Sequence, residues 1–415
     1  MTNVVVNVES YTQASLALLS NTNPFIKLTN KKYKHIEGIP GQRGTTALFD
    51  EPPTVDYVPS LAFGTFGSYT QKSVPISVEK EGSIPLGTPE LEKLFNIDVD
   101  NYMTPLAKSG VVTLGTKVGK DVALNCKEHT YLTYGDGTDS IQSYQSLDQA
   151  IENYRDAGNP ITDEMCGIIP MTACPKIIGN GLTQFAPSRN DEIANSWELG
   201  EFAGVKWYKS NLLPRHVAGT VGDQATVLTV VSINAAGTQL TLSGAANSDA
   251  NAIKKYDILT FSDGISGQPD MRYLTYFGSE ETNSVVQVRA QSDVASDETG
   301  EVIIDIFPAL ISTSGDRDSN INNAVTAGMQ MTAKKSHVCG LLFAKSAFML
   351  AMPKLVDTSP YENSTMTDPS SGISLRTYNG YFPQTAVKGF VQQVAWGSRL
   401  ADRYGMRLAF PTSNP

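Results

Sequence analysis

The chain has 415 residues, which is enough to bury a sizeable core and to form more than one domain. Charged residues make up 18% of it and hydrophobic residues 40%, which is typical of a folded protein and excludes a disordered one. Its 32 Lys and Arg against 42 Asp and Glu give a formal charge of −10, and the densest basic stretch is the short segment 31–35. This balance argues against tight nucleic-acid binding, which needs clustered basic residues to neutralise phosphates.

Cysteine usage and the N-terminal sequence bear on the cellular compartment. Four cysteines without a C-x-x-C pair make no disulfide framework, zinc ribbon or thioredoxin-type redox site: Cys126, Cys166, Cys174 and Cys339. The start, Met1–Val4, lacks the basic residues and apolar run of a signal peptide, and no stretch of about 18 apolar residues occurs that could span a bilayer. We therefore expect a protein made and folded in a cytoplasm, with no membrane segment.

The N-terminal region predicts an arm followed by a hairpin. Residues 1–53 are polar and rich in turn residues, with one apolar run at Leu16–Leu19 that predicts a short helix. A long arm with so little to bury is expected to contact the domain body or another subunit. Residues 54–85 predict an extended hairpin, because apolar and other residues alternate over 74–79. Pro75 in this run indicates an edge or protruding strand, since proline cannot donate to a sheet.

A long helix is predicted over residues 105–134. Thr104 supplies a hydroxyl N-cap, Pro105 fits the first turn, where its missing N–H costs nothing, and Gly135 ends the pattern. Its length corresponds to roughly 45 Å at 1.5 Å per residue, more than an ordinary globular helix. Three glycines would let it bend or let another backbone approach: Gly110, Gly115 and Gly119. Such a rod suits an elongated, plate-like subunit.

Residues 141–218 predict a mixed α/β region. Helices are expected at Ser146–Arg155, Cys174–Ile178 and Asn190–Trp197, and strands at Met165–Ile169 and Phe202–Tyr208, before a turn at Leu213–Arg215.

Composition changes at about residue 219, where short β runs begin. Six runs separated by Gly, Asn and Asp predict a small antiparallel barrel inserted into the larger fold: Val227–Ile233, Gln239–Leu242, Asp257–Phe261, Tyr273–Phe277, Val285–Val288 and Val302–Ile306. The polar stretch Ser312–Asn323 is interpreted as the exit linker. After it come a continuous apolar run, Val338–Met352, and a segment predicted to hold two or three buried strands, Gly380–Phe410.

Two segments superficially resemble ligand-binding loops, and both fail the requirements. The segment 115–121 is one residue short of a phosphate-binding loop, has Asp121 where a Ser or Thr must reach Mg²⁺, and falls inside the predicted helix. The segment 316–320 has the alternating carboxylates of a calcium loop, but Ile321 stands at its glycine position and Ala327 at its bidentate Glu position. We interpret them as helix and solvated linker, and Asp136–Asp139 as a turn.

The remaining search for chemistry predicts no site. Four histidines stand singly, without a partner at i+3 or i+4 that would make a ligand pair: His35, His129, His216 and His337. Cys126 and His129 share one helix face, but no second pair accompanies them. Motifs of serine hydrolases, zinc proteases and dinucleotide-binding proteins do not occur. The sequence therefore predicts no catalytic, cofactor-binding or metal-binding residues, and a protein that is not an enzyme.

Three segments resemble the coat proteins of tailed double-stranded DNA bacteriophages. Residues 71–78 with 86–91 are similar to the return strand of the family's E-loop and its approach to the spine helix. Residues 203–216 resemble the axial-domain strand that leads into an insertion, and 403–410 resemble the C-terminal strand. The order of elements is that of the Hong Kong 97 (HK97-like) coat fold. The inserted barrel makes it more similar to the coat of the short-tailed Salmonella phage type (P-twenty-two-like).

The resemblance implies an α+β, HK97-like capsid fold with an inserted antiparallel β-barrel. Its expected parts are these: N-terminal arm 1–53; E-loop hairpin 54–85; peripheral (P) domain with the spine helix 86–140; axial (A) domain, first part, 141–218; inserted barrel 219–311; A domain, second part, with linker 312–378; and C-terminal P-domain strands 379–415.

The implied function is that of a major capsid protein, whose hexamers and pentamers form an icosahedral virion shell. The implied partners are further copies of the chain, a scaffolding protein during assembly, a portal protein at one vertex, a decoration or cement protein in some relatives, and packaged double-stranded DNA without sequence-specific contacts. Alternatives left open are an encapsulin-like nanocompartment shell, a secreted β-rich adhesin or carbohydrate-binding protein, a metal-dependent enzyme, and an unrelated α/β protein with a β insertion.

Overall fold

The computed structural model describes most of the chain and divides it into two compact units. The residues described are 8–20, 23–31, 35–37, 45–50, 54–55, 69–71, 73–89, 99–138, 141–159, 164–181, 198–275, 280–312, 319–355, 362–368, 372–382 and 387–412. Unit 1 comprises 1–51, 72–123 and 346–399, and unit 2 comprises 52–71, 124–345 and 400–415. No helix in the described ranges is both long and apolar enough to cross a membrane.

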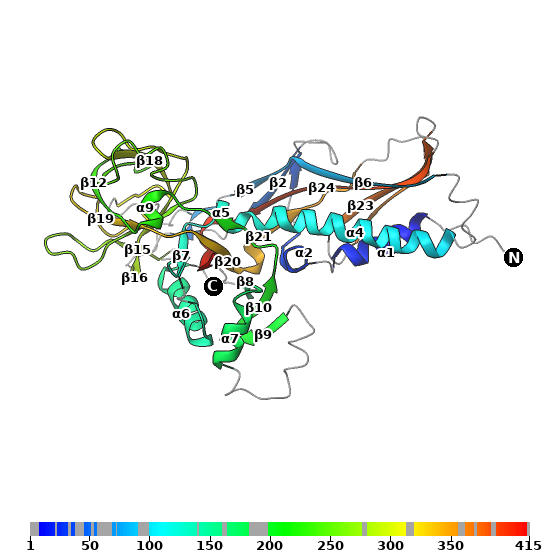
Figure 1. Cartoon of the computed structure of the whole chain (residues 1–415), viewed down its shortest axis with the longest axis horizontal. Coiled ribbons are helices and arrows are strands. Elements are labelled where there is room, and N and C mark those ends of the chain that lie inside the picture. The colour runs from blue at the N-terminus through cyan, green and yellow to red at the C-terminus, as the bar shows by residue number, and fades with distance from the viewer. Residues whose placement is uncertain are drawn as a thin grey trace, which may run out of the picture. The chain divides into compact units, whose positions relative to one another are not determined.

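In its described residues, unit 1 has three helices and two sheets (Figure 1). Its helices are α1 Val8–Ser20, α2 Pro24–Leu28 and α4 Val99–Ala123. The smaller sheet has the order β1-β2-β5, with β1 His35–Glu37, β2 Thr45–Asp50 and β5 Ser73–Val78. The larger sheet has the order β21-β24-β23-β22, with β6 also paired to β24: β6 Lys80–Pro89, β21 Phe348–Ala351, β22 Glu362–Thr367, β23 Ser374–Phe382 and β24 Val387–Leu400.

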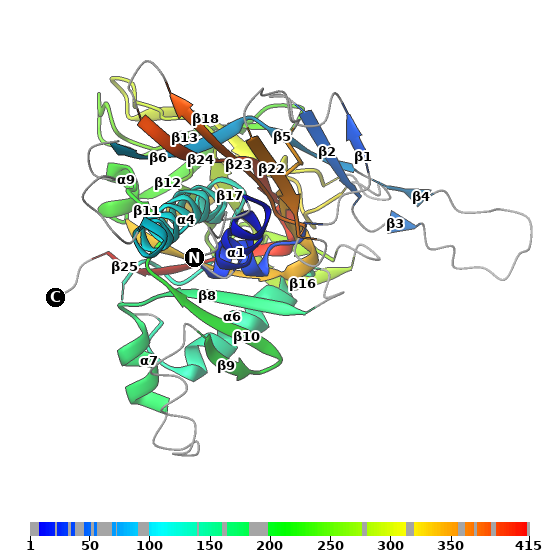
Figure 2. The same cartoon turned by 90° about the vertical axis from the view of Figure 1, so that its right-hand side faces the viewer.

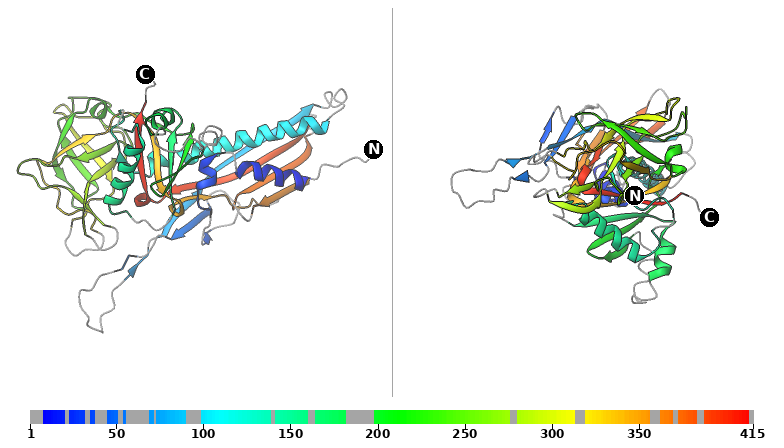
Figure 3. Two further views of the ribbon diagram at one scale, coloured as in Figure 1. Left: turned by 90° about the horizontal axis from the view of Figure 1, so that it is seen from below. Right: turned by 90° about the vertical axis from the view of Figure 1, so that its left-hand side faces the viewer.

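Helix α4 forms because apolar residues recur at helical spacing on one of its faces. Its buried side chains are Val111, Leu114, Val118 and Val122, whereas lysines and threonines between them are exposed. Figure 3 shows α4 (cyan) running along the strands β23 and β24 (orange to red). The 25 residues of α4 span roughly 37 Å and the 14 residues of β24 roughly 46 Å, so unit 1 is an elongated plate.

The predicted bounds of this helix need correction at both ends. The helix begins at Val99 rather than at Thr104, so Pro105 does not lie in its first turn. It ends at Ala123, and a separate short helix, α5 Asn125–Glu128, follows. Residues 132–134 form strand β7, because their aromatic and β-branched side chains favour strands and their backbone pairs with β25 in a sheet. Tertiary pairing here overrides a helical apolar spacing.

The alternating pattern over 73–78 predicts the observed strand correctly. In β5 the side chains of Val74, Ile76 and Val78 are buried and those between them are exposed. β5 is the end strand of its sheet, which confirms the edge position inferred from Pro75. The hairpin predicted over 54–85 is observed only in part. β3 Thr54–Val55 pairs with β4 Tyr69–Thr70, but β5 pairs with β2, outside the predicted range, and β6 pairs with β24.

The described part of the arm folds onto unit 1. Figure 2 shows α1, which contains the predicted Leu16–Leu19 helix, beside α4 and near β22 and β23. Asn23 caps α2 by accepting the Ile26 N–H at 3.0 Å, and its Nδ2 donates to the Gly115 carbonyl of α4 at 2.8 Å. A side chain at Gly119 would collide with this Asn23 amide, so this glycine admits a neighbouring side chain, whereas a bend or another backbone was expected.

Unit 2 contains a seven-stranded mixed sheet. Its path is β7-β25-β20-β8-β10-β9, and β11 pairs with the end of β20. The bounds are β7 Leu132–Tyr134, β8 Met165–Pro170, β9 Glu198–Phe202, β10 Val205–Ser210, β11 Arg215–His216, β20 His337–Ala344 and β25 Gly405–Pro411. The helices α6 Tyr144–Asp156 and α7 Cys174–Gly181 confirm two of the three helices predicted in this region; the third, Asn190–Trp197, lies outside the described residues. A short 3-10 turn, η2 Lys345–Ala347, follows β20, and another, η3 Asp402–Tyr404, precedes β25.

Six strands of unit 2 close into the predicted barrel, drawn in green and yellow in Figure 1. Its order is β12-β13-β18-β17-β14-β19, with β12 Val227–Ile233, β13 Gln239–Ser243, β14 Ile258–Phe261, β17 Gln287–Ala290, β18 Glu301–Phe307 and β19 Gln330–Ala333. Strand β19 lies beyond the expected limit at 311, so Ser312–Asn323 is followed by one more barrel strand. The run expected at Tyr273–Phe277 is instead β15 Arg272–Leu274, which pairs outside the barrel with β16 Glu281–Val285. The short helix α9 Thr220–Asp223 precedes β12.

The C-terminal strands belong to different sheets. The apolar run 338–352 provides β20 for the sheet of unit 2 and β21 for unit 1. Within 379–415, β24 lies in the large sheet of unit 1, whereas β25 lies between β7 and β20 in unit 2. Sequence periodicity identified buried strands here but carried no information on which neighbours they pair with.

Candidate functional site

The barrel is inserted into the sheet of unit 2 at one point, which we call the neck. The neck consists of two segments that connect the sheet to the barrel, and we call them the crossing segments. The chain leaves the sheet through 215–223 and returns to it through 333–338. β11 and β20 pair there in antiparallel register, with Arg215 opposite Val338 and His216 opposite His337. The two ends of the insertion are thus adjacent, and the sheet continues across them.

Hydrogen bonds tie the two crossing segments together. The Ser336 Oγ accepts the Ala218 N–H at 2.9 Å and contacts Asp223 Oδ2 at 3.2 Å, while the Ser336 N–H donates to Asp223 Oδ1 at 2.9 Å. Glycines allow close backbone approach, since a Cβ at Gly219 would collide with the Ala252 carbonyl and one at Gly222 with the Lys334 carbonyl.

Asp257, at the entrance to barrel strand β14, is the main acceptor of the neck. Its Oδ1 lies 2.7 Å from His216 Nε2, and its Oδ2 accepts the N–H groups of Gly219 at 3.0 Å and Lys254 at 2.8 Å. The Asp257 side chain is fully buried. A buried carboxylate is tolerated because donors surround it, and here those donors come from both the sheet and the barrel.

Arg407 of β25 is a fully buried cation that bonds mostly to backbone oxygens. Its Nη1 donates to the Tyr256 carbonyl of the barrel at 3.2 Å, its Nη2 to the Lys127 carbonyl at 2.7 Å, and its Nε to Thr130 Oγ1 at 3.2 Å. Burial lowers the pKa of the guanidinium, and Asp257 is among the groups that raise it again. Asp257, at the same junction, thus stabilises the charged form of Arg407.

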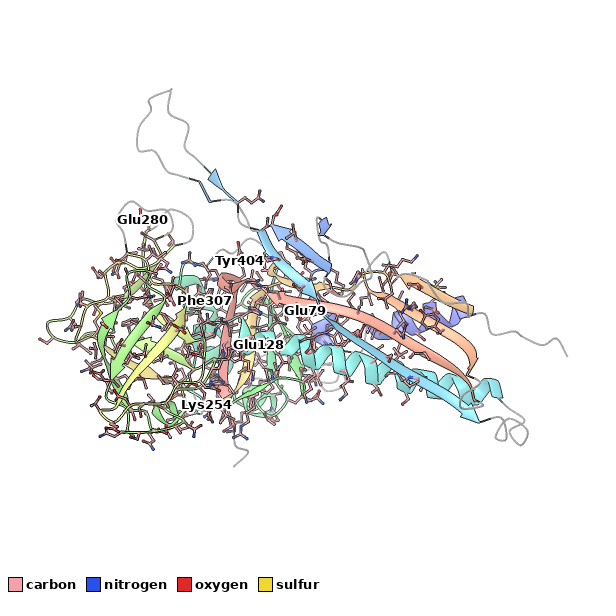
Figure 4. The ribbon with its side chains drawn as sticks, turned by 90° about the horizontal axis from the view of Figure 1, so that it is seen from above. Glu79, Glu128, Lys254, Glu280, Phe307 and Tyr404 are labelled. Carbon is pink, nitrogen blue, oxygen red and sulfur yellow. The ribbon has the colours of Figure 1, made fainter. Side chains whose placement is uncertain are left out.

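Further contacts join barrel to sheet beside the neck. The Gln287 amide exchanges two hydrogen bonds with the backbone of Thr133, at 2.6 and 3.0 Å. Arg289 donates to the Glu128 carbonyl and lies over the Phe307 ring, 5.1 Å from its centroid; Glu128 and Phe307 are labelled in Figure 4. Tyr131 packs against Phe307 with ring centroids 6.0 Å apart. The junction therefore combines buried polar groups with a few aromatic contacts.

The histidines at the neck are brought together although 121 positions separate them in the chain numbering. Their ring centroids lie 5.3 Å apart. Burial, with Arg407 and Lys127 nearby, lowers the pKa of His216 despite its bond to Asp257. Burial and the charge of Arg407 lower the pKa of His337 to about 3. We therefore expect both imidazoles to be neutral at neutral pH.

Where the structure describes them, the segment that superficially resembles a phosphate-binding loop forms a helix and the segment around Asp136 forms a turn. The segment 115–121 is helical, and Asp121 accepts hydrogen bonds from Trp396 Nε1 at 2.8 Å and Lys80 Nζ at 2.6 Å, which tie α4 to β24 and β6. The turn at Asp136 is confirmed by its Oδ1, which accepts from the Thr138 N–H and hydroxyl. Residues 316–318 of the calcium-like segment lie outside the described residues.

The four cysteines and His129 form no recognisable centre with other described residues. All four cysteines are free and buried, as expected of a chain without a disulfide framework, and burial raises the pKa of Cys166 to about 12 and of Cys174 to about 11. The thiol of Cys126 is fully buried, whereas Nδ1 of His129 lies 3.7 Å from Oδ1 of Asp402. Among the described residues, no group of three or more His, Cys, Asp or Glu side chains has a metal-binding arrangement. The side chain of His35 lies outside the described atoms.

Sequence reasoning missed the neck cluster of His216, Asp257, His337 and Arg407. These residues are far apart in the chain, and each reads singly as a polar residue beside a strand. The available signal was positional, because His216 and His337 stand just outside the two ends of the β-rich insertion. Only the pairing of β11 with β20 brings the two imidazoles together.

Comparisons with known proteins give matches to solved structures. No protein-family model matches the chain, and no curated protein sequence matches it. A Mycobacterium phage Che8 structure aligns with 92% of this chain and 90% of its own at 10% identity and a TM-score of 0.42. The capsid of Cyanophage P-SCSP1u aligns with 93% and 87% at 13% identity and a TM-score of 0.40. A virus-like particle from Pyrococcus furiosus aligns with 96% and 97% at 7% identity and a TM-score of 0.37.

Proposed function

We propose that this chain is the major capsid protein of a tailed double-stranded DNA bacteriophage, of the HK97-like type with an inserted barrel. In this proposal identical copies form hexamers and pentamers that tile an icosahedral shell. The contacts are heterologous, which means that a patch on one copy meets a different patch on the next and the ring closes by rotation.

The observation that carries the proposal is the elongated plate of unit 1. A 25-residue helix runs along a sheet with strands of 10 and 14 residues, about twice the usual strand length. A plate of this kind has a large edge relative to its core, and such an edge is useful when neighbouring copies cover it. The described residues 73–78 and 86–89 of the segments that resemble the E-loop return belong to unit 1.

Two further features support the proposal. The stem of the hairpin at 54–70 is a two-stranded ladder, and an isolated ladder of this size is not stable without a neighbour. The barrel enters and leaves the sheet at paired strands, as an insertion into an axial domain would. In this assignment the hairpin is the E-loop, α4 is the spine helix, unit 1 corresponds to the P domain and the sheet of unit 2 to the A domain.

The same proposal gives the partners. A scaffolding protein would guide assembly, a portal ring would occupy one vertex, and double-stranded DNA would be packaged without sequence-specific contacts. The formal charge of −10 suits this role, because an inner wall that bound DNA tightly would hinder packaging.

The test is expression of the full chain, followed by sedimentation and electron microscopy. We expect closed shells or capsomer rings of uniform size. A variant in which residues 56–68 are replaced by Asn-Gly keeps the β3–β4 ladder and removes the loop beyond it. This variant should retain the circular dichroism spectrum of the wild type and form few or no particles. Replacement of residues 56–68 by a Gly/Ser segment of equal length tests whether the length of this segment is sufficient for assembly.

Monomers under all assembly conditions, in the presence of a co-expressed scaffolding protein, would contradict the proposal. Shells that enclose a host enzyme and exclude DNA would favour an encapsulin-like nanocompartment instead.

A further inference from the structure

The neck carries one imidazole on each of its two crossing segments. His216 ends β11, where the chain enters the barrel, and His337 begins β20, where the chain returns. The two rings lie 5.3 Å apart at an interplanar angle of 56°, and both residues are buried, with 3% and 0% of their surface exposed.

Each imidazole is bonded in a way that suits its neutral form. His216 Nε2 donates to the Asp257 carboxylate, which can only accept, so the proton of the neutral ring is on Nε2. His337 Nδ1 lies 2.6 Å from the Lys335 carbonyl and therefore donates to it. His337 Nε2 is buried and has no hydrogen-bond partner among the described residues. A second proton on His337 would thus point into the protein without an acceptor.

The charges that face the two rings come from every element packed around them. Arg407 of β25, Lys127 of α5 and Lys334 after β19 lower the pKa of one or both rings, whereas Asp257 raises that of His216. At neutral pH the buried charges of Arg407 and Asp257 balance. Protonation of both imidazoles would leave Asp257 facing three buried cations, Arg407 included. The thiols of Cys126 and Cys339 also face Arg407, and burial raises the pKa of each, so they supply no negative charge.

The two structures joined at the neck do not need each other for their cores. The barrel is closed and has its own apolar interior, which includes Leu228, Leu240, Leu242, Ile258, Val288 and Ile304. The sheet has a separate interior formed by β8, β20 and β25. The contact between them rests on the polar groups of Asp257, Arg407 and Gln287 and on the packing of Tyr131 and Arg289 against Phe307. Opening it would therefore leave both cores intact.

We propose that the neck is a proton-operated latch, in which His216 and His337 hold the barrel against the sheet while both rings are neutral and release it when both take up protons. The latch follows from the fold of unit 2 and does not depend on the capsid assignment. Its pH range lies below the ordinary histidine range, because the folded protein resists protonation at both positions.

The test is hydrogen–deuterium exchange of the full chain at pH 7.5 and pH 4.5, corrected for the intrinsic rate at each pH. Peptides that contain the Gly219 and Thr133 amides, which donate to the barrel residues Asp257 and Gln287, should exchange at least tenfold faster at pH 4.5. Peptides from β13 and β18 inside the barrel should keep their protection. A titration of the same peptides gives the midpoint of release.

Variants separate the latch from general acid instability. H216Q/H337Q keeps amide donors at both positions and cannot titrate, so its junction peptides should stay protected at pH 4.5. H129Q removes a histidine outside the neck, near Asp402, and should release as the wild type does. If the double variant is already open at pH 7.5, the single variant H337Q provides the test, with a release midpoint shifted to lower pH. Unchanged protection of the wild-type junction at pH 4.5, loss of protection in β13 and β18 together with it, or release of the non-titrating variants at the wild-type pH would each overturn the latch.

Discussion

The seat of helix α4 in unit 1 and the neck of unit 2 attach their parts in opposite ways. α4 is held mainly by apolar side chains at helical spacing and by close approach at glycine, with polar ties at Asp121 and from Asn23 to the Gly115 carbonyl. The neck is held by a buried carboxylate, a buried guanidinium and two imidazoles. Apolar attachment is insensitive to pH, whereas buried ionisable groups make attachment depend on their charge state. One chain can thus contain an attachment whose strength is independent of pH and another whose strength changes with pH.

Removing the central acceptor of the neck should have the largest effect. Asp257→Ala leaves His216, two backbone N–H groups and the charge of Arg407 without their partner, which we expect to cost about 3 to 5 kcal/mol. Urea unfolding followed by hydrogen exchange of unit 2 peptides measures it. Asp257→Asn, which keeps the shape and one acceptor oxygen, should cost less; equal costs would show that the charge is irrelevant.

The pH dependence of stability should come next. The pKa of His337 is about 3 in the folded protein against an ordinary value of 6.5, so the unfolded chain binds the additional proton first as pH falls. The contribution of His337 to the free energy of unfolding of unit 2 should therefore be constant above pH 6.5. It should fall by roughly 4 kcal/mol between pH 6.5 and 3.5. Urea titrations of wild type and H337Q give the difference, which isolates histidine from the carboxylates. Parallel curves for the two proteins would contradict this.

The apolar joint should respond to a cavity and not to pH. Leu114→Ala in α4 removes a buried side chain that lies near Trp396 and Gly82, and we expect a loss of about 3 kcal/mol in the free energy of unfolding of unit 1. The same loss should be measured at pH 7.5 and at pH 5.5. Val112→Ala, at an exposed position on the same helix, is the matched control and should change little.

The smallest effect is expected where the arm meets α4. Asn23→Ala removes the cap of α2 and the donor to Gly115, at a cost of about 1 to 2 kcal/mol. Asn23→Ser keeps a capping oxygen but cannot reach the Gly115 carbonyl, so it should recover part of the loss. Hydrogen exchange of peptides from α1 and α2 reads this effect, and identical exchange in all three proteins would show that the arm is held elsewhere.

The sequence predicted elements wherever one local pattern dominated. The alternation around Pro75 gave both the strand β5 and its edge position, and the β runs after residue 219 gave five of the six barrel strands. Patterns failed where pairing decided the structure. Residues 132–134 joined a sheet despite a helical spacing, and β19 closed the barrel after a polar stretch that resembled a linker.

The neck could not be predicted for a related reason. A single buried histidine has no local signature, and its environment is assembled by segments around 127, 257, 337 and 407. Sequence alone gives the residue types, whereas burial and the balance of charges exist only after the sheet and barrel have formed. These ionisable groups match no catalytic motif, so the sequence assigns them no role.

The antiparallel pairing of His216 with His337 also bears on how such a chain can change over generations. Because the two ends of the insertion are neighbours across one ladder, a two-residue turn can replace everything between them without moving β11 or β20. A gene segment for a whole module can therefore be gained, lost or exchanged at this position in one event, while the pairing of β11 with β20 is kept. The same property makes this position a natural site for grafting a foreign domain.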